Sequence, residues 1–263
     1  MSKKLNKKQI ERFSRQIILK NIGILGQNKI TNAKVLIIGM GGLGCPVAEF
    51  LTRSGIGSLG IVDHDRISLS NIHRQSLFNE KDLNQQKVKI AKKKLNKINS
   101  LTKIKIFNYK LNKSNFQKII KDYDYIVDGT DNLPTRYLID DLCSIIDLPW
   151  VYGSIYRFEG QVSVFNFDGG PSYRDLFPEP PPSESVPSCA DGGVLGVLPG
   201  VIGSIQATEA IKLITGVGQL LSGKLLIYDA ENMNFNRLNF EKVEDRTQIQ
   251  DLSLAMKMFV DEG

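Results

Sequence analysis

The chain has 263 residues, of which 41% are hydrophobic and 24% charged, and its formal net charge is +6. This composition is typical of globular proteins and excludes the collagen-like, disordered and small disulfide-rich classes. The three cysteines are scattered and indicate a reducing compartment, and no apolar signal segment follows the basic N-terminus. We therefore expect a cytoplasmic protein that does not enter membranes. Many lysines lie on helical patterns within residues 81–121, which favours a solvated helix face over a nucleic-acid surface.

Short apolar runs alternate with helical patterns over the first two thirds of the chain. The predicted strands are Lys34–Ile38, Leu59–Val62, Ile104–Phe107, Tyr125–Val127, Trp150–Tyr152 and Val162–Phe165. The predicted helices are Leu43–Ser54, Gln85–Ile98, Asn115–Lys121 and Thr135–Ile146. This alternation indicates an α/β fold with a Rossmann-like, doubly wound and mostly parallel sheet.

The pattern changes in the last third of the chain. Residues 168–193 are rich in Pro, Ser and Gly and predict a long crossover loop, which in a compact domain is usually functional or disordered. A helix is predicted at Val201–Ile214, with a stop at Thr215-Gly216. Two late antiparallel strands, Leu225–Tyr228 and Asn234–Phe240, would extend the sheet as a hairpin.

No internal repeat or linker divides the chain, so a single domain is the better interpretation. We expect this domain to span residues 1–243 and to begin with an N-terminal helix at residues 6–21. Residues 244–263 are expected to form a C-terminal tail.

A glycine-rich turn follows the first predicted strand. It reads Gly-Met-Gly-Gly-Leu-Gly, and its glycines are Gly39, Gly41, Gly42 and Gly44. Such a turn lets the backbone approach a phosphate, and the following helix N-terminus supplies unpaired N–H groups. Asp63 ends the second strand, where a carboxylate binds ribose hydroxyls. The pattern predicts a nucleotide site and leaves an NAD-dependent oxidoreductase and an ATP-using enzyme equally open.

The residues after the second strand favour ATP. Ser70, Asn71 and Arg74 form a polar cluster, and Lys87 opens the next predicted helix. An arginine fork and a lysine point charge together neutralise the oxygens of a triphosphate during transfer. A nicotinamide dinucleotide carries only a pyrophosphate and does not require two such cations.

Asp131 and Asn132 follow the fourth predicted strand. Carboxylates at this edge suit Mg2+, which binds through one or two of them together with substrate phosphates. Taken singly, Asp131 would more often be a helix N-cap, and Arg74 or Lys87 a surface charge. Their shared location at strand ends favours a common site.

Six stretches of the sequence match one known family. They are RFSRQIIL (12–19), GMGGLGCP (39–46), VDHDRISLSNIHRQ (62–75), DGTDNLPTRY (128–137), FEGQVSVF (158–165) and CADGGVLGVLPGVIGSIQATEAIKLITG (189–216). From Arg12 to Phe240 the chain resembles the ubiquitin-activating-enzyme-like adenylyltransferases of the HesA/MoeB/ThiF type.

The resemblance implies an activity and a substrate. A small ubiquitin-like sulfur-carrier protein would present its C-terminal Gly-Gly carboxylate to ATP, giving an acyl adenylate and pyrophosphate. The product would serve sulfur transfer in molybdenum-cofactor, thiamine or related biosynthesis. The family acts as a homodimer, and the resemblance implies that Arg15 reaches the ATP site of the neighbouring subunit. It also implies that ATP is bound by Gly42, Asp63, Asn71, Arg74 and Lys87, and Mg2+ by Asp131 with Asn132 beside it.

Two features of the family need separate treatment here: the role of one cysteine is open, and the zinc ligands are missing. Cys189 aligns with a thiol that in some members forms a covalent intermediate, and a covalent role and no role have equal weight. Many members hold a structural zinc with two Cys-x-x-Cys pairs, but residues 172–175 read Ser-Tyr-Arg-Asp and no cysteine follows Cys189. We therefore expect no structural zinc and a crossover loop ordered by its prolines or by the carrier. With no appended sulfurtransferase domain, sulfur would come from a separate sulfurtransferase or a cysteine desulfurase.

Three alternatives remain at the level of sequence. The glycine turn with Asp63 also fits an NAD-dependent Rossmann oxidoreductase. A second alternative is a binding module without turnover, against which Arg74, Lys87 and Asp131 argue. The third is ATP-dependent activation of another carboxylate, such as one on a modified tRNA base, which the basic net charge keeps open.

Overall fold

The computed structural model describes residues 4–181 and 192–243, and its strands form one eight-stranded sheet. The strand order is β3-β2-β1-β4-β5-β6-β7-β8; β1 to β5 pair in parallel and β5 to β8 pair antiparallel. The strands are β1 (Lys34–Ile38), β2 (Ser58–Val62), β3 (Lys103–Phe107), β4 (Tyr125–Asp128), β5 (Trp150–Tyr156), β6 (Glu159–Phe165), β7 (Lys224–Asp229) and β8 (Asn234–Asn239). The predicted Rossmann-like, mostly parallel α/β sheet with antiparallel C-terminal strands is confirmed.

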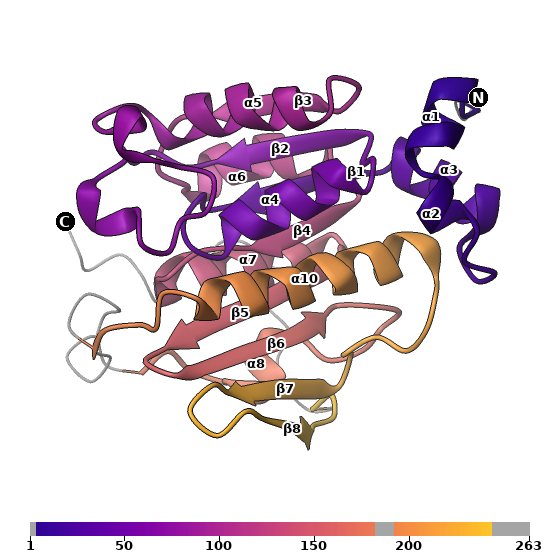
Figure 1. Ribbon diagram of the computed structural model, residues 1–263. Helices are drawn as coiled ribbons and strands as arrows, with labels where there is room; N and C mark the ends of the chain where they lie inside the picture. Colours follow the sequence, from indigo (N-terminus) through magenta and orange to yellow (C-terminus); the bar gives the residue numbers. More distant parts are fainter. Residues whose placement is uncertain (1–3, 182–191, 244–263) are drawn as a thin grey trace.

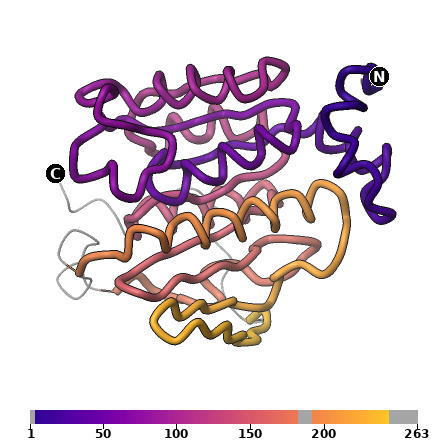
Figure 2. Tube along the Cα trace, in the orientation of Figure 1, coloured from indigo at the N-terminus to yellow at the C-terminus, as the bar shows by residue number. Residues whose placement is uncertain are grey.

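Helices cover both faces of the sheet (Figure 1). Those on one face are α4 (Gly44–Arg53), α5 (Lys87–Ile98) and α10 (Leu198–Thr215). Those on the other face are α6 (Lys113–Ile120), α7 (Leu133–Ile145) and α8 (Tyr173–Leu176). The trace in Figure 2 shows α10 running alongside α4, although the two helices are far apart in the sequence. None of the described helices combines the length and the apolar character needed to cross a membrane.

The two-sided covering explains the unbroken apolar runs of the central strands. In β1, Val35 and Ile37 join the apolar core under α4, α5 and α10, whereas Leu36 and Ile38 join the core under α6 and α7. Alternate side chains of a strand point to opposite faces, so a strand buried on both faces is hydrophobic throughout. This is why the sequence located these strands well.

The N-terminal segment differs from the single helix predicted at residues 6–21. The structure divides it into α1 (Lys7–Arg12) and α2 (Ser14–Ile17), followed by α3 (Gly23–Asn32). The helix is interrupted at Phe13, whose ring is 5% exposed and lies against Gly55, where an added Cβ would come within 2.4 Å of the ring. Burial of this aromatic ring outweighs continuation of the helix.

The described part of the predicted crossover loop contains a short helix, α8, which a buried ion pair joins to α7. The Arg174 guanidinium donates to both carboxylate oxygens of Asp141, at 2.6 and 3.0 Å, and both side chains are buried. The neighbouring Asp140 accepts from the backbone N–H groups of Tyr173 and Arg174. Burial raises the pKa of Asp140 to about 6, although these hydrogen bonds oppose the shift. A buried ion pair therefore anchors this part of the loop, and Arg174 also donates to the Pro178 carbonyl oxygen at 3.2 Å.

The resemblance assigns to Ser172 and Asp175 the positions of the first two zinc cysteines of many family members. One Asp175 oxygen accepts from the Ser172 N–H at 2.7 Å and its hydroxyl at 3.0 Å, and the other accepts from the Val243 N–H at 3.2 Å. Structural zinc sites take thiolate and imidazole ligands, and neither of these two side chains supplies one. The hydrogen bonds instead join the crossover loop to the segment that follows β8.

Replacing Asp175 should destabilise the fold if this link is a structural element. Asp175→Asn leaves one good acceptor for three donors, so we expect the free energy of unfolding to fall by about 1–2 kcal/mol. Denaturant unfolding measures this change, with Asp168→Asn in the same loop as the matched control because Asp168 is exposed. An equal effect of the two substitutions would contradict the assignment.

Candidate active site

A cavity of about 530 Å³ opens at the carboxyl ends of the parallel strands, where the strand order reverses between β1 and β4. Ligands of doubly wound sheets bind at this reversal, because the loops there diverge to opposite faces. The predicted site residues that line the cavity are Gly39, Gly41, Gly42, Asp63, Asn71, Arg74, Lys87, Asp131 and Asn132. The structure thus brings together residues from four separate segments.

The glycine turn brings two loops into close contact. Gly39 has a φ of +89°, which favours glycine, and a Cβ there would lie 2.6 Å from the Gly129 carbonyl oxygen. A Cβ on Gly44 would lie 2.0 Å from the Gly39 carbonyl oxygen. Gly44 therefore does not line the cavity; it allows α4 to begin directly against the turn, which places the helix N-terminus at the cavity.

Asp63 is held in place by backbone groups. Its carboxylate accepts from the Met40 N–H within the glycine turn and from the Asp65 N–H, both at 2.7 Å, and the residue is 9% exposed. It therefore fixes the turn and still faces the cavity, where a carboxylate can accept from ribose hydroxyls.

The polar cluster after β2 positions the arginine. Arg74 donates to the Ser70 carbonyl oxygen at 2.8 Å and lies 2.7 Å from Nε2 of His73. Ser70 itself does not line the cavity, so its contribution is to orient Arg74 through its backbone. The Asn71 side chain accepts from the Ser68 N–H and stabilises the same turn.

Lys87 is paired with a residue that the sequence did not single out. Its ammonium donates to the Asp65 carboxylate at 2.7 Å, and its own N–H donates to the Asp65 carbonyl oxygen. The lysine is 5% exposed, whereas the Asp65 side chain is about half exposed. An ammonium has three donors, so Lys87 can keep this partner and still bind a phosphate oxygen. The Asp-x-Asp spacing after β2 was the available signal for Asp65.

The loop after β4 offers one carboxylate to the cavity. Asp128 is fully buried and paired with Arg136, whereas Asp131 is exposed and lines the cavity. Within the described ranges, no hydrogen bond or ion pair involves the Asp131 carboxylate. Such a carboxylate beside a phosphate site fits Mg2+. The helix cap is Asn132, whose side chain accepts from the Thr135 N–H at 3.0 Å.

Two further predicted residues lie elsewhere. Arg15 is exposed on α2, which lies at the opposite end of the sheet from the strands' carboxyl ends (Figure 1). Cys189 lies within residues 182–191, which are outside the described part of the chain. Burial raises the pKa of Cys45 to about 12 and that of Cys143 well above its usual value, which supports packing roles for both.

The C-terminal end of the crossover loop forms part of the cavity wall, which the sequence did not predict. Arg157, at the tip of the β5–β6 hairpin, exchanges backbone hydrogen bonds with Gly193 and Leu195. Val194 and Tyr156, which flank this contact, line the cavity. The loop is therefore closed onto the site at its C-terminal end.

Comparison with known proteins identifies the family. The ThiF family matches residues 13–248. The chain is 47% identical to "Adenylyltransferase and sulfurtransferase MOCS3" of Aedes aegypti over 89% of its own length and 54% of that protein. It is 43% identical to "Sulfur carrier protein adenylyltransferase" of Thermus thermophilus over 90% of its own length and 89% of that protein. The chain thus spans about half the length of the MOCS3 relatives it matches.

A solved structure supports the fold assignment. Escherichia coli MccB, crystallised with ATP, has a TM-score of 0.78 at 20% identity, over 94% of this chain and 76% of that one. Since the family match covers nearly the whole chain, the protein belongs to the ThiF family.

Proposed function

We propose that the protein is an ATP-dependent adenylyltransferase that acts on the C-terminal Gly-Gly carboxylate of a small ubiquitin-like sulfur carrier. The observation that carries this proposal is the convergence of Arg74, Lys87 and Asp131 on one cavity beside the glycine turn. Two cations and a free carboxylate suit a triphosphate with a divalent ion better than a dinucleotide. Family membership and the names of the relatives also favour this reading over an NAD-dependent oxidoreductase.

The geometry suggests how ATP would bind. Asp63 would accept from the ribose hydroxyls, and the N-terminus of α4 would face the phosphates. Arg74, which lies beside Gly42 of the glycine turn, and Lys87 would contact phosphate oxygens. Mg2+, held through Asp131 with Asn132 beside it, would neutralise charge on the phosphates.

The reaction is an in-line displacement at the α-phosphate. A carboxylate oxygen of the carrier forms a bond to phosphorus, and the bond between the α-phosphorus and its bridging oxygen to the β-phosphate breaks. Pyrophosphate leaves with that electron pair, and no proton is transferred because the attacking carboxylate is already ionised. The residues act by positioning and charge neutralisation, so no protein nucleophile is required for this step.

The substrate proposal relies on the relatives and on the cavity wall. The Thermus thermophilus relative is named a sulfur carrier protein adenylyltransferase. In this chain, Tyr156 and Val194 line the same cavity as the proposed ATP-binding residues. A Gly-Gly end carries no side chains, so it is the slimmest peptide end that could enter this cavity. Activation of a modified tRNA base has no comparable support in the described residues.

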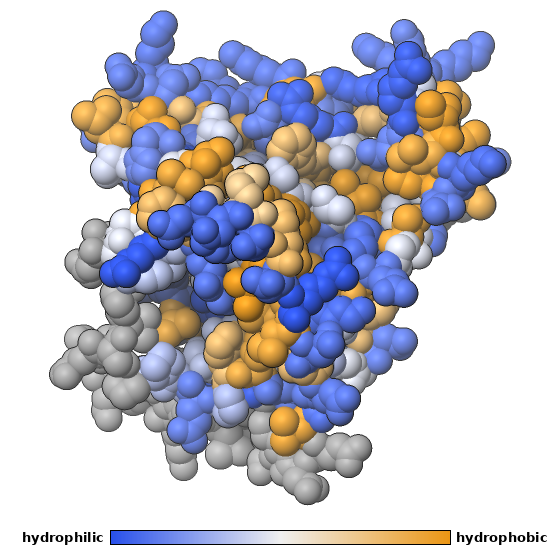
Figure 3. Space-filling view, turned by 60° about the horizontal axis from the view of Figure 1, so that its bottom comes forward, coloured by the Kyte–Doolittle hydropathy of each residue, from blue (hydrophilic) through white to orange (hydrophobic). Residues whose placement is uncertain are grey.

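A homodimer would complete the site. Exposed apolar side chains gather on the N-terminal helices, seen at the right of Figure 3. They are Ile18, Leu19, Ile24 and Leu25, of which Leu25 is 79% exposed. A patch of this kind marks an interaction surface. Because α2 lies far from its own cavity, we propose that Arg15 acts in the partner subunit's ATP site.

We further propose the domain extent, the location, the sulfur donor and the pathway of the protein. A single domain over residues 1–243 fits the single sheet. A cytoplasmic location, a separate sulfurtransferase or cysteine desulfurase as sulfur donor, and a covalent role for Cys189 extend the same proposal. The pathway served would be molybdenum-cofactor, thiamine or related biosynthesis.

Loss of the Asp131 carboxylate should abolish turnover without unfolding the protein, because the side chain is exposed. We expect Asp131→Asn to lower carrier-dependent ATP–pyrophosphate exchange by at least about 100-fold. The matched control is Asp147→Asn, an exposed aspartate outside this cavity, which should exchange normally. Magnesium-dependent exchange at the wild-type rate in Asp131→Asn would refute the role of Asp131.

Arg15→Ala should also lose at least about 100-fold in exchange if the arginine serves the neighbouring site. Mixing Arg15→Ala with Asp131→Asn subunits creates dimers with one intact site. Random reassociation of equal amounts should restore about one quarter of the wild-type rate. Absence of recovery in mixed dimers, with mixing verified by differently tagged subunits, would contradict action across the interface.

A further inference from the structure

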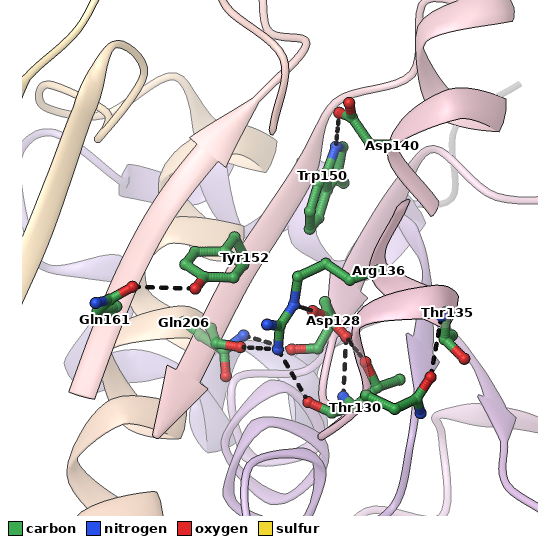
Figure 4. A network of polar contacts seen from close by, with 11 residues as sticks. Asp128, Thr130, Thr135, Arg136, Asp140, Trp150, Tyr152, Gln161 and Gln206 are labelled. Atoms are coloured by element: carbon green, nitrogen blue, oxygen red, sulfur yellow. Dashed lines mark hydrogen bonds and ion pairs between the residues drawn. The ribbon is translucent and has the colours of Figure 1, made fainter. Parts of the chain in front are cut away.

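A buried arginine, Arg136, lies beside the loop that carries Asp131 and lines the same cavity. Arg136, on α7, is 5% exposed, and its Nε donates to the Asp128 carboxylate at 3.0 Å, while Asp128 is fully buried (Figure 4). Burial alone would lower the pKa of Arg136, but Tyr152 and Asp128 hold it above its ordinary value. The guanidinium therefore remains charged, and the pair is electrically neutral as a whole.

The other Asp128 oxygen shapes the loop. It accepts from the Thr130 N–H at 2.9 Å and from the Thr130 hydroxyl at 2.6 Å. The Asp128 carbonyl oxygen accepts from the Gln206 side chain on α10 at 2.7 Å. The Asp128 side chain and carbonyl oxygen together fix the backbone of residues 128–130, which immediately precedes Asp131.

Arg136 also binds the loop itself. Its Nη2 donates to the carbonyl oxygens of Thr130 and Gly153, both at 3.3 Å. Its guanidinium lies over the Tyr152 ring, 4.8 Å from the ring centre. One side chain therefore joins the loop after β4 to strand β5 through three carbonyl or carboxylate groups.

Stability alone is a poor reason for this arrangement. A buried ion pair contributes little net stability, because desolvation of both charges offsets their attraction. Its main effect is geometric, since an arginine fork fixes its partners in direction as well as distance. Asp131 makes no hydrogen bond of its own in the described part of the chain, so its position depends on the loop backbone.

We propose that Arg136 is a positioning residue that acts through Asp128 and Thr130 to hold the Asp131 carboxylate at the phosphate end of the cavity. This inference rests on the proposed function, because it concerns the binding of Mg2+ together with ATP. Partners that orient a metal ligand control metal affinity without touching the ion. Arg136 thus sets the gain in ATP affinity that Mg2+ provides. Because Arg136 also lines the cavity, a direct contact with ATP would instead show as a loss of affinity in EDTA, and that result would contradict the positioning role.

Arg136→Lys separates charge from geometry. The lysine keeps a cation beside Asp128 and so avoids an unpaired buried charge, but a single ammonium cannot replace the planar fork toward Thr130 and Gly153. The matched control is Arg174→Lys. Arg174 is also buried, pairs with an aspartate and lies 4.7 Å from a tyrosine ring centre, but it does not line the ATP cavity.

Calorimetric titration with ATP, in EDTA and in excess Mg2+, tests the inference without relying on turnover. In Arg136→Lys, we expect the gain in ATP affinity on adding Mg2+ to fall by about tenfold, and the affinity in EDTA to stay at the wild-type value. Arg174→Lys should keep the wild-type gain, even if both variants have a lower melting temperature.

Three further outcomes would count against the inference, and they can be told apart. A wild-type gain in Arg136→Lys would show that Arg136 is only structural. An equal loss of gain in Arg174→Lys would show that the effect follows general destabilisation. If the unaltered protein bound no ATP in either condition, the proposed function itself would fail, and this inference with it.

Discussion

The site depends on the close approach of two loops at the reversal of strand order. Gly39 after β1 and Gly129 after β4 leave no room for a side chain between them. Because of this contact, the glycine turn that faces the phosphates and the loop that carries Asp131 share one cavity. A side chain at Gly39 would push the loops apart and would separate the proposed metal ligand from the phosphates it serves.

Nine residues that line the cavity could be predicted from the sequence, because they lie on segments that follow buried strands. The run Lys34–Ile38 is apolar at four of its five positions since both of its faces are covered, so its end and the glycine turn were easy to locate. The parallel order then places Asp63, Arg74, Lys87 and Asp131 at the same edge of the sheet. Periodicity and turn chemistry sufficed for these residues.

Three charged residues that hold the site together could not be predicted in this way. Asp65, Asp128 and Arg136 act through partners that are distant in sequence or buried, and a charged residue in a helical pattern gives no sign of burial. The crossover loop was difficult for a related reason. Its anchor pairs Arg174 with Asp141 on α7, and its composition indicates only a loop. The N-terminal helix was overextended because only tertiary packing reveals that Phe13 turns inward.

The measurement that tests the account most directly is the mass of a candidate sulfur carrier after incubation with the protein, ATP and Mg2+. We expect a carrier ending in Gly-Gly to gain one AMP group at its C-terminus, in step with the release of pyrophosphate. A carrier lacking the last glycine should gain none. Pyrophosphate release without any carrier adenylate, or equal modification of the shortened carrier, would contradict the central claim.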